Sequence, residues 1–108
     1  MAESNLTGAN LIGANLTGAD LSFDPTGFIE VPGANLERAN LTGADLTGAG
    51  LREANLTRVD LTSADLTCGD LTRAVLFEAN LADANLEKAN LTGADLEGAN
   101  LSLSLIHI

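Results

Sequence analysis

The sequence has very few of the residues from which catalytic and metal sites are built. It contains one histidine, His107, and one cysteine, Cys68. A catalytic triad, a Cys-His pair or a zinc site needs several such groups together, and a single cysteine excludes an internal disulfide. We therefore expect no enzyme activity, and neither a metal nor an organic cofactor.

Aromatic residues are equally scarce. The chain has three Phe and neither Trp nor Tyr, although 45% of its residues are hydrophobic. Leucine and alanine supply most of this apolar content. We therefore expect a narrow core filled by a column of aliphatic side chains.

Basic residues are few as well, with five Lys and Arg against 15 Asp and Glu, for a net charge of −10. This balance argues against direct binding to nucleic acid or to an anionic membrane, because both require basic patches. The chain has no apolar run of the roughly 18 residues that a membrane helix needs. Residues 1–4 do not resemble the start of a signal peptide, so we expect a cytoplasmic location.

What the sequence does have is a leucine at every fifth position. Steps of five from Leu6 to Leu101 give 20 positions, and leucine occupies 18 of them, with Thr26 and Val31 as the exceptions. This spacing would spread the leucines around an α-helix and would alternate them between the two faces of a flat strand. A chain that turns a corner about every five residues can point every leucine at one axis. The period therefore predicts a solenoid.

The neighbours of each leucine repeat too. Alanine usually stands two residues before the leucine, and Asn or Asp stands directly before it. We expect the alanine to point inward with the leucine, and the Asn or Asp side chain to hydrogen-bond to the local backbone. The two residues that follow each leucine are mostly polar, so we assign them to the outer surface.

Segments such as Ala84-Asn85-Leu86-Glu87-Lys88 resemble the A-(N/D)-L-x-x motif of the pentapeptide repeat family, and the resemblance runs from about Asn5 to Leu101. It implies an all-β fold: a right-handed, quadrilateral parallel β-helix with four repeats, about 20 residues, per coil. It also implies a non-enzymatic scaffold or protein-interaction module, of bacterial origin, with an unknown protein partner.

The repeat domain is expected over residues 4–101, with one interruption at residues 22–33. The distance from Leu21 to Leu36 is 15 residues, so the phase of the repeat survives. The segment is either two degenerate repeats or a loop. We favour the loop, because the degenerate repeats would point the carboxylate of Asp24 into the core, where an unpaired charge is costly.

The last residues, 102–108, depart from the motif. Their alternating leucines fit a short terminal strand. Leu103 to Ile108 also resemble the in-frame translation of the mosaic-end adapter used in transposon-based sequencing libraries. Our hypothesis is that this tail is an artefact and that the natural chain continues beyond Leu101.

Counting in steps of 20 gathers acidic residues on two neighbouring faces of the expected rod, with only Lys88 as a basic residue among them. All four arginines fall on the other two faces. The candidate interaction surface comprises Asp45, Asp60, Asp65, Asp83 and Glu87, to which we add the outward Phe77 and, from the loop, Phe23 and Phe28.

Three interpretations of the acidic faces remain open: a surface that is only solvated, a surface that binds an unknown protein, and a mimic of DNA. The net charge of −10 over a rod about 24 Å tall is of the same order as the one charge per ~1.7 Å of B-DNA. Quinolone-resistance proteins of the family mimic DNA in this way and bind type II topoisomerases such as gyrase. Against this alternative, leucine fills nearly every central position of the repeat, and residues 102–108 do not resemble the C-terminal dimerisation module of those proteins.

Overall fold

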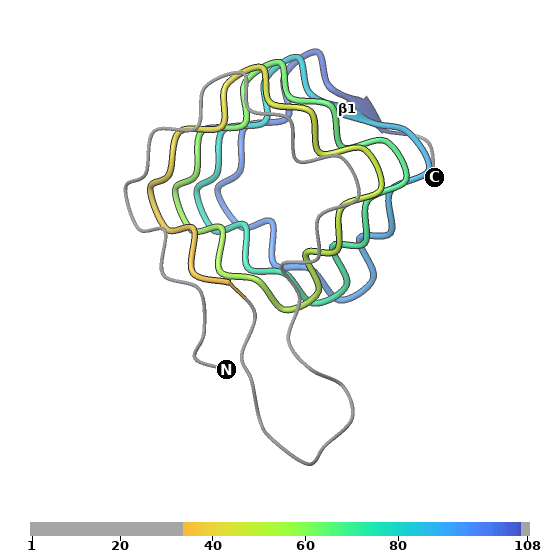
Figure 1. Cartoon of the computed structure of the whole chain (residues 1–108). Coiled ribbons are helices and arrows are strands. Elements are labelled where there is room, and N and C mark those ends of the chain that lie inside the picture. Colours follow the sequence, from red (N-terminus) through yellow and green to blue (C-terminus); the bar gives the residue numbers. More distant parts are fainter. Residues whose placement is uncertain (1–33, 107–108) are drawn as a thin grey trace.

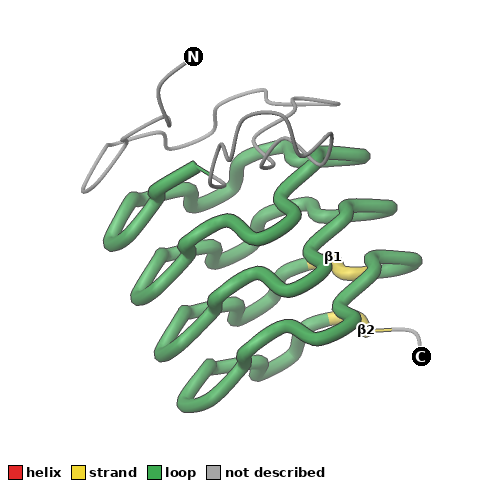
Figure 2. The backbone as a smooth tube through the Cα atoms, turned by 90° about the horizontal axis from the view of Figure 1, so that it is seen from below, coloured by secondary structure: helices red, strands yellow, loops and turns green. Residues whose placement is uncertain are grey.

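A computed structural model describes residues 34–106 of the protein. In this part the chain winds into stacked coils that overlie one another (Figures 1 and 2). Parallel β-bridges join residues 20 positions apart, from Asn35 with Asn55 to Asn80 with Asn100. The regular strands described are two residues long, β1 (Asn85–Leu86) and β2 (Leu105–Ile106), and they pair in parallel. The fold is thus all-β, although it contains little continuous strand.

A tight turn follows each inward leucine. The carbonyl of Leu36 accepts a hydrogen bond from the amide of Ala39 at 2.9 Å, and the same bond recurs in each repeat as far as Leu101 and Ser104. The second residue after the leucine has a positive φ in every one of these turns, as at Arg38 (61°) and Gly43 (67°). A positive φ at this position is typical of a type II turn. Four such turns lie between bridge partners, which are 20 residues apart.

Successive coils are joined by backbone hydrogen bonds. The amide of Leu36 donates to the carbonyl of Asn55 at 2.8 Å, and the amide of Asn55 donates to the carbonyl of Ala34 at 2.9 Å. A third bond, from Arg38 to Thr57, links the corners at 2.9 Å. Because the same three bonds recur at each repeat, the backbone polar groups of the inner coils are satisfied without regular sheets.

The core contains the leucines and alanines that the repeat predicted. Every leucine of the motif from Leu36 to Leu86 is no more than 1% exposed, and the alanines two residues earlier pack beside them. Burying one leucine contributes about 1.5–3 kcal/mol. In the last coil the same positions are only partly buried, and they line an open hollow of about 640 Å³. Each coil thus depends on its neighbours for burial.

The coil extends beyond the end of the sequence motif. The amide of Ser104 donates to Leu101 at 3.1 Å, and the amide of Leu105 donates to Ala84 at 2.9 Å. Residues 102–106 therefore keep the turn and the bridge of the earlier repeats, although we expected the repeat to end at Leu101. The physical reason is that Ile106 lies five residues after Leu101 and lines the same apolar end of the core, while the hydroxyl of Ser104 donates to the carbonyl of Leu101 at 2.7 Å and adds to the backbone bonds.

Three expectations lie outside the described residues: the repeats at residues 4–21, the loop at residues 22–33 and the end of the tail. No helix in the described part of the chain has the length and apolarity needed to cross a bilayer.

Candidate protein-binding surface

The acidic residues of the repeat are held by the turns that follow them. Asp45 accepts hydrogen bonds through Oδ1 from the amide of Thr47 at 3.1 Å and from its Oγ1 at 2.7 Å. Asp60 makes the same pair of bonds with Thr62, at 3.0 and 2.6 Å. These bonds fix one carboxylate oxygen against the backbone and orient the carboxyl group at the rod surface. The local bonding that the sequence predicted for Asn and Asp is confirmed.

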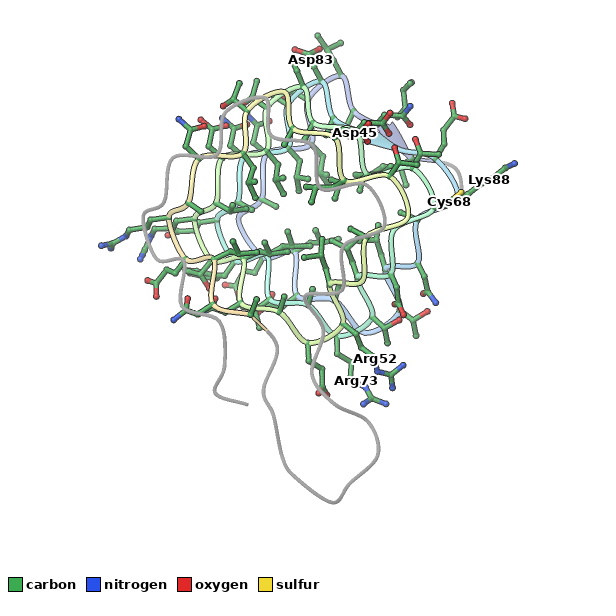
Figure 3. The ribbon with its side chains drawn as sticks, viewed as in Figure 1. Asp45, Arg52, Cys68, Arg73, Asp83 and Lys88 are labelled. Atoms are coloured by element: carbon green, nitrogen blue, oxygen red, sulfur yellow. The ribbon has the colours of Figure 1, made fainter. Side chains whose placement is uncertain are left out.

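The 20-residue register brings the predicted acidic residues onto adjacent parts of the rod. Asp45 and Asp65 are bridge partners on one side of the rod. Asp60 lies on the neighbouring side, which the chain passes through just before that side in each coil. Asp83 lies at the corner between these two sides, as its place in Figure 3 shows. Glu87 follows at the next corner. We call Asp45, Asp60, Asp65, Asp83 and Glu87 together the acidic side.

One basic residue accompanies the acidic side. Lys88 lies at the same corner as Cys68 in Figure 3, next to Glu87 in the sequence. The side chains of Asp83, Glu87 and Lys88 are exposed. Five carboxylates against one ammonium group leave this part of the rod strongly negative.

The remaining two sides carry the arginines, and positive and negative side chains are mixed there. The Nε of Arg58 lies 2.8 Å from Oε1 of Glu78, and Nη1 of Arg73 lies 3.3 Å from Oε1 of Glu53. Both pairs join residues 20 apart and so connect successive coils. They are exposed to solvent, where such pairs stabilise a protein by at most about 1 kcal/mol. Within residues 34–106 these two sides carry four arginines and six carboxylates, so their net charge is −2, against −4 for the acidic side.

Phe77, which we predicted as an interaction residue, is not grouped with the carboxylates. It is partly buried at the corner that also carries Arg58, and the Arg58 guanidinium carbon lies 5.8 Å from the centre of its ring. A cation–π contact of this kind stabilises the ring on its own chain. The other two predicted aromatics, Phe23 and Phe28, lie outside the described residues.

Asp70 has a distinctive environment that we did not single out from the sequence. Hydrogen bonds from the side chain and the backbone amide of Thr72 hold the pKa of Asp70 below its usual range, and the charge of Arg52 acts in the same direction. Thr72 is buried. The Asp-Leu-Thr spacing alone could not identify this site, because Asp45, Asp60 and Asp65 stand in the same spacing. The distinguishing partner, Arg52, comes from the preceding coil.

Within 34–106, no three His, Cys, Asp or Glu side chains are arranged so that they could hold a metal ion. Cys68 is exposed and is not part of a disulfide. What the surface presents is a fixed pattern of charge on a hydrogen-bonded backbone.

Comparison with known proteins identifies related sequences and structures. The sequence profile described as "Pentapeptide repeats" matches residues 1–23, 33–67 and 70–105, with eight copies. HetL from the cyanobacterium Nostoc sp. strain PCC 7120, a pentapeptide repeat protein involved in heterocyst differentiation regulation, has 35% identity and a TM-score of 0.57; the match covers 96% of this chain and 49% of HetL. The chain therefore spans about half the length of HetL.

Two further structures are similar. The pentapeptide repeat protein Rfr23 from the cyanobacterium Cyanothece 51142 has 26% identity and a TM-score of 0.59, with 95% of this chain and 91% of Rfr23 covered. Full-length QnrB1, a plasmid-mediated fluoroquinolone resistance protein, has 18% identity and a TM-score of 0.47. The match covers 96% of this chain and 63% of QnrB1. The likeness to QnrB1 is too weak to support an argument about function. A search of curated proteins gave no match.

Proposed function

Because the chain belongs to the pentapeptide repeat family, we propose that it is a non-enzymatic scaffold that binds another protein through its acidic side. In this proposal the stacked coils form the right-handed, four-sided parallel β-helix that the repeat motif implies. The proposed location is the cytoplasm. The single observation that carries the proposal is the gathering of five carboxylates on adjacent sides of the rod, opposite the half where arginines pair with glutamates.

The backbone supports a binding role because it is already ordered. Each inner repeat is fixed by one turn bond and by bonds to the coils above and below. Association then loses less conformational freedom than it would with a flexible surface. The acidic carboxylates of the repeats are also held in place, as in the bonds of Asp65 to Thr67. The scaffold thus presents charge in a preformed arrangement.

The chemistry of the surface indicates the kind of partner. A negative side attracts a protein with a complementary basic patch, which raises the association rate more than it strengthens the complex. Such attraction is screened by salt, with a Debye length of about 8 Å at physiological ionic strength. HetL is involved in the regulation of heterocyst differentiation, and this supports an interaction role for the present chain as well.

The experiment compares two variants that each lose three negative charges. The acidic-side variant replaces Asp with Asn at two bridge positions and at one corner: Asp60→Asn, Asp65→Asn and Asp83→Asn. Asn is already frequent in the repeat and keeps the Oδ1 acceptor. The control variant changes the other half of the rod: Glu37→Gln, Asp95→Asn and Glu97→Gln.

Immobilised wild-type and variant proteins are used to capture partners from bacterial lysate, and each captured protein is then purified and titrated directly by calorimetry. We expect a partner that binds the wild type and the control variant alike, and binds the acidic-side variant at least tenfold more weakly. Equal affinity for all three proteins would refute the role of the acidic side.

The second candidate is a DNA mimic that binds a type II topoisomerase. The observation that favours it is one pair of carboxylates at coil spacing, Asp45 directly beside Asp65. A gyrase supercoiling assay tests this function separately. Inhibition or protection by micromolar wild-type protein, lost in the acidic-side variant, supports mimicry. Unchanged supercoiling removes this candidate and leaves the scaffold proposal intact.

A further inference from the structure

We draw no further inference here: the strongest candidate, the open apolar end of the last described coil at Leu91, Leu96, Leu101 and Ile106, carries none because nothing in the structure shows what covers it.

Discussion

Asp45 and Asp65 are β-bridge partners on successive coils, and each carboxylate accepts hydrogen bonds from the threonine two residues later. Two like charges therefore lie beside each other at the strand spacing of roughly 4.8 Å. Asn85, the next residue of the same row, is neutral. The threonine bonds orient both carboxylates, but they do not remove the repulsion between them.

We predict that Asp65→Asn leaves the protein as stable or makes it more stable, by up to about 1 kcal/mol, because like charges directly opposite each other are destabilising. The asparagine keeps the acceptor for Thr67. Urea unfolding at low salt measures the free energy of unfolding, and the gain should shrink in 0.5 M NaCl as the charges are screened. A loss above about 1 kcal/mol would show that the Asp65 charge itself stabilises the fold.

The turns make a second prediction, at Gly43. Its φ is +67°, and no atom lies within 4 Å of the position that a Cβ would occupy. Gly43→Ala should therefore cost about 1–2 kcal/mol through backbone strain alone. Thermal unfolding followed by circular dichroism measures this change.

The matched comparison is Gly98→Ala, where φ is +72° and a Cβ would also lie 3.0 Å from Cγ of Glu78. This variant should lose at least as much stability as Gly43→Ala. If Gly43→Ala were neutral, the corner would not hold the positive φ that the fold requires.

Val59 and Gly69 make the third prediction. Both occupy the inward position where the motif has alanine, half a coil apart and so on opposite sides of the core. Val59 is fully buried, and a Cβ on Gly69 would lie 3.0 Å from the Leu66 carbonyl oxygen and 3.4 Å from Cδ1 of Leu71. We predict that the larger residue and the smaller one compensate in volume.

We expect Val59→Ala to leave a cavity and Gly69→Ala to crowd the core, each costing about 1–3 kcal/mol. The double variant should lose at least about 0.5 kcal/mol less than the sum of the single variants. A double-mutant cycle in urea measures this coupling. Strict additivity would mean that the two positions do not share the same space.

Asp70 gives a prediction about pH. Its pKa in the folded protein is lowered from the ordinary value of 3.8 by the bonds from Thr72. A carboxyl group with a depressed folded pKa contributes stability above its unfolded pKa, and this contribution disappears as the pH falls through the folded pKa. We expect wild type to lose more stability than Asp70→Asn between pH 5 and pH 2.5, as measured by urea unfolding. Asp83→Asn, at an exposed corner, is the control and should follow wild type more closely.

The sequence predicted the inward leucines and alanines, the local bonding of Asn and Asp, and the grouping of the acidic residues, because the five-residue period directly determines which side chains point to the axis. It did not predict the ring contact between Phe77 and Arg58, or the effect of Arg52 on Asp70. Both depend on the conformations of long side chains from different coils. We also did not expect the coil to extend through residues 102–106, where Ile106 keeps the five-residue phase and the hydroxyls of Ser102 and Ser104 add hydrogen bonds to those of the backbone.

The most direct test of the stacked coil is a pair of spin-label experiments in a Cys68→Ser background. Labels replace Ser63 and Asp83, which are 20 residues apart at the same corner, or Ser63 and Arg73, which are ten residues apart at opposite corners. The coil predicts strong dipolar broadening for the first pair, since successive coils lie roughly 4.8 Å apart, and little broadening for the second. Absence of broadening in the first pair would contradict the fold, because an α-helix would place those residues about 30 Å apart.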